Sequence, residues 1–124
     1  LMNYLAIDFG TKRIGLAYSQ DGIISTLPAI KNDPELIKNI KKVINEYHID
    51  KIYVGISEGV FGETTQKFVT YLGSMIRLPI DTVEEAVSTI EADTIFKKNK
   101  KSAKLYHQLI DSISAAVILN RVIG

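Results

Sequence analysis

A pair of apolar runs joined by a short polar loop, at the start of the chain, restricts the fold more than any other feature. Residues 5–9 read LAIDF, residues 14–18 read IGLAY, and residues 10–13 between them read GTKR. This pattern is typical of a β-hairpin, in which Gly10 supplies the backbone angles that a tight turn requires. We therefore expect two antiparallel strands at the beginning of the chain.

Asp8 is the unusual residue of this hairpin, because it lies within an apolar run that should be buried. Removing an unpaired carboxylate from water costs several kcal/mol. Asp8 therefore requires a metal ion, a cation or several N–H donors. A second interpretation is that Asp8 ends its strand and caps the turn, and this segment alone leaves both open.

The rest of the chain shows alternating strand and helix patterns. A turn at Asp21-Gly22 and a third strand at 23–30 complete an antiparallel meander. Asn32, Asp33 and Pro34 have the residue types of a helix start, with a capping side chain followed by proline. The further elements predicted by hydrophobic spacing and capping signals are a helix up to 47, a parallel strand at 51–56, a helix at 63–76, a short strand at 79–83, and helices beginning at Ser88 and Ser102.

Length and composition exclude several classes of protein. With 124 residues, residues 1–124 are expected to form a single domain. Cysteine is absent and only two histidines occur, so a thiol nucleophile and a cysteine- or histidine-based metal site are not expected. No apolar run approaches the ~20 residues of a membrane span, and no signal peptide precedes the first strand. We therefore expect a cytoplasmic protein without a membrane partner.

Acidic residues occur at two further positions where predicted elements end or pack. Glu84 and Glu85 lie between a strand and a helix, where open α/β sheets bind their ligands. Asp111 lies on the margin of the apolar face of the last helix, one turn before Ala115. The alternatives are a favourable interaction of the glutamates with a helix dipole and a solvent-facing Asp111. We hypothesise that acids from these positions meet Asp8 at one end of the sheet.

Residues 8–17, DFGTKRIGLA, resemble the opening signature of the YqgF/RuvX family of ribonuclease H-like nucleases. That family has been linked to maturation of the 16S ribosomal RNA precursor and to Holliday junction resolution. The resemblance extends at intervals to the C-terminus, where residues 110–112 (IDS) and the alanine pair 115–116 match the family pattern. It implies an α/β, ribonuclease H-like fold with a mixed five-stranded sheet, formed by the three-strand meander and two parallel strands, and with helices on both faces.

The resemblance also implies a catalytic site in which Asp8, Glu85 and Asp111 bind Mg²⁺ or Mn²⁺ and support hydrolysis of phosphodiester bonds. Glu84 stays an alternative to Glu85, because the register at a strand end is uncertain by a residue or two. Ala86 occupies the place of a family arginine, so the function of that side chain in substrate binding is in doubt.

Basic residues are the candidates for substrate binding, since phosphate contacts dominate nucleic-acid affinity. They are Lys12 and Arg13 in the hairpin loop and the lysine segment, which we define as Lys97, Lys98, Lys100, Lys101 and Lys104. For the lysine segment, plain solvation is an equal alternative. The expected partners are structured RNA or branched DNA, with ribosomal particles as a further candidate, and the expected state is a monomer or weak homodimer.

Three other functions are compatible with parts of this pattern. A Holliday junction resolvase would share the fold and the acids but act on DNA. A non-catalytic nucleic-acid or ribosome-binding module is favoured by the alanine at position 86. An actin-like ATPase would need two such domains and two phosphate-binding hairpins, and this chain is too short and shows only one.

Overall fold

The computed structural model describes residues 2–56, 60–84 and 103–123, and the side chains of all of these except 60, 61 and 103–111. The strands are β1 (Tyr4–Asp8), β2 (Arg13–Gln20), β3 (Ile23–Lys31), β4 (Lys51–Ile56) and β5 (Ile80–Glu84), and the helices are α1 (Leu36–Glu46), α2 (Val60–Met75) and α4 (Ala103–Ile123). None of the described helices is both long enough and apolar enough to cross a membrane.

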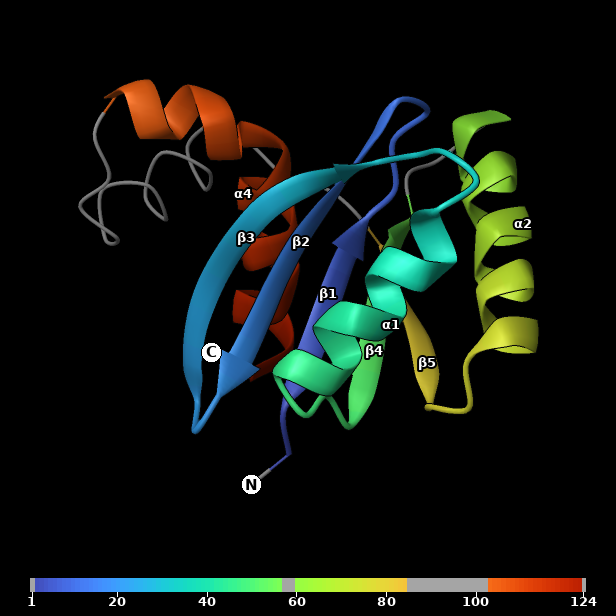
Figure 1. Cartoon of the computed structure of the whole chain (residues 1–124), viewed down its shortest axis with the longest axis horizontal. Helices are drawn as coiled ribbons and strands as arrows, with labels where there is room; N and C mark the ends of the chain where they lie inside the picture. The colour runs from blue at the N-terminus through green and yellow to red at the C-terminus, as the bar shows by residue number, and fades with distance from the viewer. Residues whose placement is uncertain (1, 57–59, 85–102, 124) are drawn as a thin grey trace.

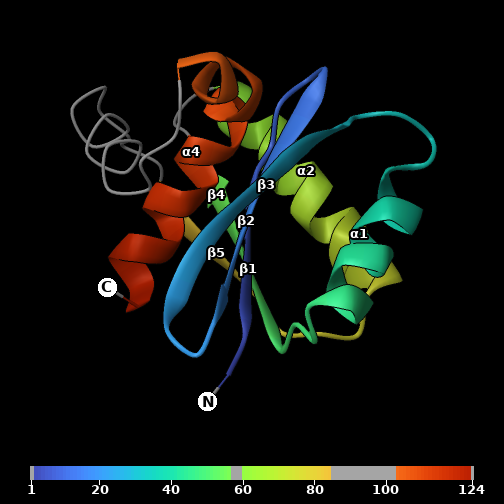
Figure 2. The same cartoon turned by 60° about the vertical axis from the view of Figure 1, so that its left-hand side comes forward.

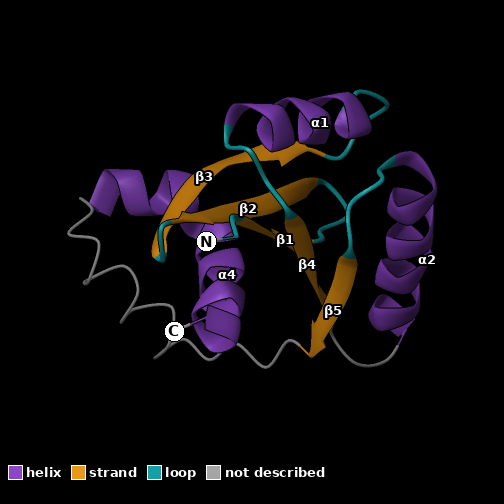
Figure 3. Cartoon of the chain, turned by 90° about the horizontal axis from the view of Figure 1, so that it is seen from below, coloured by secondary structure: helices purple, strands orange, loops and turns teal. Residues whose placement is uncertain are grey.

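The strands form one five-stranded sheet in the order β3-β2-β1-β4-β5 (Figure 1). Neighbouring strands are antiparallel from β3 to β1 and parallel from β1 to β5. Helices α1 and α2 cover one face, and α4 covers the other (Figures 2 and 3). The predicted mixed sheet with helices on both faces is therefore confirmed.

Two hydrophobic clusters divide the side chains between these two faces. The cluster under α1 and α2 includes Leu5, Ile7, Leu16, Val54 and Leu72. The cluster under α4 contains smaller residues, among them Ala6, Ala17, Ala115 and Ala116, all of which are buried. Because these alanines have short side chains, α4 packs closely on β1 and β2.

The hairpin of β1 and β2 is confirmed, but the predicted reason for Gly10 is wrong. Gly10 is not among the residues with positive φ. A Cβ atom added to Gly10 would lie only 2.3 Å from the carbonyl oxygen of Arg13. Glycine is therefore required here because the loop folds back closely on itself. The next turn does use the left-handed region, since Asp21 and Gly22 have φ of 52° and 79°, as in a type I′ hairpin.

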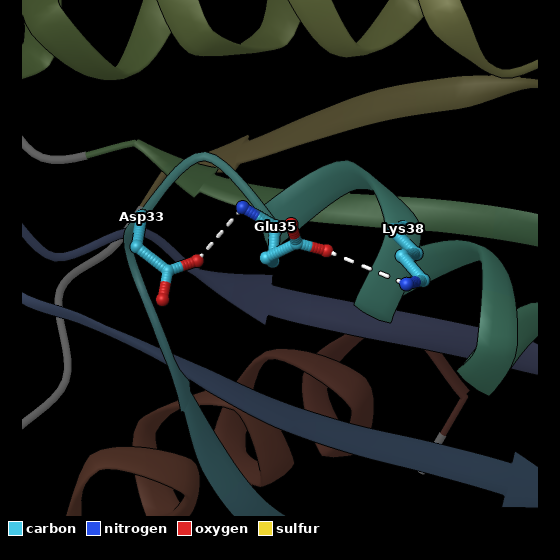
Figure 4. A network of polar contacts seen from close by, with 3 residues as sticks. All are labelled: Asp33, Glu35 and Lys38. Atoms are coloured by element: carbon cyan, nitrogen blue, oxygen red, sulfur yellow. Dashed lines mark hydrogen bonds and ion pairs between the residues drawn. The ribbon is translucent and has the colours of Figure 1, made fainter.

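Helix α1 begins later than predicted, at Leu36. A carboxylate oxygen of Asp33 accepts the N–H of Glu35 at 2.9 Å, and Glu35 pairs with Lys38 at 3.6 Å (Figure 4). Residues 33–35 thus form a turn that leads into the helix, and the cap residue Glu35 makes no side-chain capping bond. Helix α2 begins three residues earlier than predicted, while the helix predicted from Ser88 and the predicted cap Ser102 lie outside the described residues.

Candidate functional site

Asp8 is the last residue of β1, the central strand of the sheet. Along β1, Tyr4 and Ala6 pack against the α4 cluster, so strand alternation places Asp8 on the same face. Its cross-strand neighbours are Gly15 of β2 and Gly55 of β4. Neither neighbour has a side chain that could cover the half-buried carboxylate. At the level of Asp8, the two neighbouring strands therefore contribute no side chain beyond the backbone.

Helix α4 is fixed to the sheet directly beside this position. The backbone N–H of Leu16 donates to the hydroxyl oxygen of Ser112 at 3.1 Å, and Ser112 is fully buried. Leu16 pairs with Ile7, the residue before Asp8. Asp111 precedes Ser112 on the helix, so its backbone lies in the turn of α4 that contacts this end of β1. The side chain of Asp111 is outside the described part of the structure.

The end of β5 lies at the same edge of the sheet. Val83 pairs with Gly55, which pairs with Asp8, so Val83 and Asp8 lie at one level, two strands or about 10 Å apart. Val83 packs against the α4 cluster, whereas Ile80 packs against the α1 and α2 cluster. Alternation therefore directs Glu84 to the face opposite Asp8, and a guanidinium N–H of Arg121 donates to its backbone carbonyl at 3.5 Å.

The predicted set of ligands stays a prediction. Within the described parts of the chain, no three histidine, aspartate or glutamate side chains form a group that could hold a metal ion. Glu85 and the side chain of Asp111, two of the three predicted ligands, lie outside those parts. The structure places Ser112, the residue after Asp111, against Leu16, whose strand partner Ile7 precedes Asp8.

Of the predicted substrate-binding residues, Lys12 and Arg13 are described, and both are exposed beside the end of β1. The lysine segment from 97 to 101 lies outside the described residues, as does the side chain of Lys104. Asn32 was not among the predicted site residues, and we interpreted it only as part of a helix start at residues 32–34. Its side-chain amide instead donates to the carbonyls of Gly10 at 3.0 Å and Thr11 at 3.3 Å, in the loop that contains Lys12.

Other polar and hollow features lie at the opposite end of the sheet. Lys51, at the start of β4, pairs with Asp81 at 2.7 Å, and this hydrogen bond raises the pKa of Lys51. A cavity of about 370 Å³ is lined by residues of α1, by the last residue of α2 and by the segment that follows it, including Lys41, Met75 and Arg77. Neither feature includes a predicted site residue.

Two solved structures have a fold similar to that of this chain. One is the T. thermophilus RuvC in complex with a Holliday junction substrate, with a TM-score of 0.61 and 12% identity over 99% of this chain and 94% of that chain. Another is the Fowlpox virus resolvase with Holliday junction DNA, with a TM-score of 0.63 and 10% identity over 99% of this chain and 100% of that chain. The fold is thus that of the ribonuclease H-like resolvases, which confirms the predicted fold class.

Sequence relatives give the family. The family model described as "RuvX: Holliday junction resolvase" matches residues 2–124. A protein of Sulfurimonas denitrificans is 35% identical over 97% of this chain and 95% of its own length, and one of Prochlorococcus marinus (strain MIT 9215) is 39% identical over 94% and 80%. Both are named "Putative pre-16S rRNA nuclease". The chain belongs to the RuvX family of nucleases, as the resemblance of its first strands predicted.

Proposed function

We propose that this chain is an endonuclease that uses Mg²⁺ or Mn²⁺ to hydrolyse phosphodiester bonds in nucleic acid. The observation that supports this most directly is the position of Asp8. A half-buried carboxylate ends the central strand between Gly15 and Gly55, on the face covered by α4. The adjacent turn of α4 contains Asp111 and is fixed by the bond from Leu16 to Ser112.

Asp8, Glu85 and Asp111 would hold the metal, because carboxylate oxygens are the ligands that Mg²⁺ prefers. Bound metal ions supply an activated water and stabilise the leaving oxygen of the scissile phosphate. The strand alternation that turns Glu84 away from Asp8 supports Glu85 as the third ligand. Lys12, Arg13 and the lysine segment would bind the phosphates on either side of the cleaved bond.

The substrate that we propose is the precursor of 16S ribosomal RNA, free or in ribosomal particles, because the relatives with 35% and 39% identity are named for it. Branched DNA is the second candidate, since the matching family model is described as a Holliday junction resolvase. Incubating the purified protein with a structured 16S precursor RNA and with a four-way DNA junction separates these two candidates.

The variant Asp8→Asn tests the site itself. We expect it to lower Mg²⁺-dependent cleavage at least about a hundredfold, because even outer-shell partners of metal ligands contribute about ten- to a hundredfold. The control is Asp21→Asn, in an exposed turn at the other end of the sheet. Circular dichroism should show the same fold for both variants.

Retained cleavage by Asp8→Asn would remove Asp8 from the site. A wild-type protein that binds the RNA or the junction and cleaves neither with Mg²⁺ or Mn²⁺ would instead be a non-catalytic binding module.

A further inference from the structure

We propose that Asn32 is a positioning residue, which holds the loop between β1 and β2 so that Lys12 and Arg13 can bind the nucleic-acid backbone. This inference rests on the proposed function, because it assigns a role in substrate binding to a residue outside the predicted site. Asn32 lies between β3 and α1, twenty-two residues after Gly10.

Three hydrogen bonds join Asn32 to three consecutive carbonyls of the loop. The side-chain amide donates to Gly10 at 3.0 Å and to Thr11 at 3.3 Å. The backbone N–H of Asn32 donates to the carbonyl of Lys12 at 2.9 Å. An asparagine amide has two N–H donors, which matches its two carbonyl acceptors in the loop.

The register of the sheet explains why this residue lies beside the loop. Lys31 is the last residue of β3 and pairs with Arg13, the first residue of β2. Because the two strands are antiparallel, the residue after Lys31 lies opposite the residue before Arg13, and the bond from Asn32 to Lys12 continues the ladder by one step. Asp33, and not Asn32, accepts the bond that begins the turn into α1.

The loop that Asn32 holds lies directly after Asp8, contains Lys12 and leads into Arg13 at the start of β2. Thr11, Lys12 and Arg13 are all exposed, and residues 9–12 belong to neither strand. Without a partner outside the hairpin, such a loop would sample several conformations. When a cation is already held in its bound conformation, less conformational entropy is lost as the ligand binds. Asn32 thus reduces the cost of placing Lys12 and Arg13 on phosphates.

The test compares two asparagines that make the same kind of bond at opposite ends of the sheet. Asn32→Ala removes both amide bonds to the loop. Asn3→Ala is the matched control, because the amide of Asn3 also donates to two consecutive carbonyls, those of Tyr47 and His48, both at 3.2 Å. We expect Asn32→Ala to raise KM for the cleaved nucleic acid about five- to tenfold with little change in kcat, as for the loss of one to two hydrogen bonds.

A double-mutant cycle shows whether Asn32 acts through the two cations. In a protein with Lys12→Ser and Arg13→Ser, adding Asn32→Ala should change KM no further, because the groups that it positions are gone. Hydrogen exchange of the amides of residues 10–13 should be faster in Asn32→Ala than in the wild type and unchanged in Asn3→Ala.

The possible failures are distinguishable. If the wild type cleaves nucleic acid and Asn32→Ala has the same KM, or if its effect adds fully to that of the Lys12 and Arg13 substitutions, the positioning role is wrong while the proposed function stands. If the wild type neither binds nor cleaves the RNA or the junction, the proposed function fails and this role fails with it.

Discussion

The buried hydroxyl of Ser112 accepts the backbone N–H of Leu16 at 3.1 Å, across ninety-six residues of sequence. The pairing of β2 with β3 shifts in register between Ile14 and Leu16, and a hydroxyl from α4 binds the amide at this irregularity. Ser112 follows Asp111, and Leu16 pairs with the residue before Asp8. One hydrogen bond thus sets the position of α4 along the sheet, close to the end of β1 where Asp8 lies.

Ser112→Ala should therefore destabilise the protein, because it leaves a buried N–H group without its acceptor. We expect the free energy of unfolding to fall by about 1–3 kcal/mol, measured by urea denaturation. Ser114→Ala is the control, because Ser114 lies two residues further along the same helix and is half-buried. It should lower the free energy of unfolding by less. Equal stability of Ser112→Ala and the wild type would show that the bond does not hold α4 in place.

Two glycines should respond in opposite directions to replacement by alanine. At Gly10 a Cβ atom would lie 2.3 Å from the carbonyl oxygen of Arg13, so the loop must shift, at a cost of about 1–3 kcal/mol for an overpacked position. At Gly73, an exposed residue within α2, a Cβ atom meets nothing within 4 Å. Gly73→Ala should stabilise the protein by about 0.5–1 kcal/mol through helix propensity. Thermal unfolding of the two variants measures both effects, and a stabilised Gly10→Ala would contradict this view of the loop.

Most of the fold was predictable because its signals are local. Short apolar runs predicted the strands, and apolar stripes at helical spacing predicted α1, α2 and α4. Boundaries were less accurate at helix starts, where Asp33 forms a turn of its own before α1. The need for Gly10 was predicted but its cause was not, because the contact with the carbonyl of Arg13 appears only once the loop is folded.

The candidate site was predictable only in part, because its geometry depends on register. Asp8 stood out in the sequence as a carboxylate in an apolar strand. The glycines beside it, Gly15 and Gly55, become its neighbours only through strand pairing. The role of Asn32 depends in the same way on the pairing of Lys31 with Arg13. The residue types predicted the kind of chemistry, and the pairing of the strands determined which residues lie next to one another.

Strand alternation makes a prediction about the two adjacent glutamates. Val83 faces α4, so Glu84 faces away from Asp8, and Glu85 is the better candidate for a metal ligand. Glu85→Gln should lower cleavage at least about a hundredfold, because even residues that only contact a metal ligand contribute about ten- to a hundredfold. Glu84→Gln should retain most activity. Titration calorimetry with Mn²⁺ should show weaker binding only for Glu85→Gln. The opposite order of effects would exchange the two assignments.

The ion pair at the other end of the sheet should give a pH-dependent contribution to stability. The hydrogen bond to Asp81 raises the pKa of Lys51 above its ordinary value of 10.5. The folded protein therefore holds this proton more tightly, so the stabilisation is complete below pH 10.5 and is lost as the pH rises through the raised pKa. Lys51→Met should be less stable than the wild type near about pH 8, and the difference should shrink in alkaline buffer. Lys42→Met, an exposed position on α1, is the control, and a pH-independent difference for Lys51→Met would contradict the linkage.

The lysine segment offers a test that separates binding to phosphates from plain solvation. If the lysine segment contacts the nucleic-acid backbone, its five lysines displace counterions when the protein binds. Changing Lys97, Lys98, Lys100, Lys101 and Lys104 to serine removes that part of the counterion release. The slope of log Kd against log salt concentration should then decrease by about 0.7 to 0.9 for each phosphate contact that is lost. Fluorescence anisotropy with a structured 16S precursor RNA at several salt concentrations measures this slope.

Replacing three lysines of α1 (Lys38, Lys41 and Lys42) by serine is the control for net charge, because these exposed residues lie on the face opposite α4. A slope that changes by the same amount per lysine removed in both variants would indicate that the lysine segment contributes only general charge.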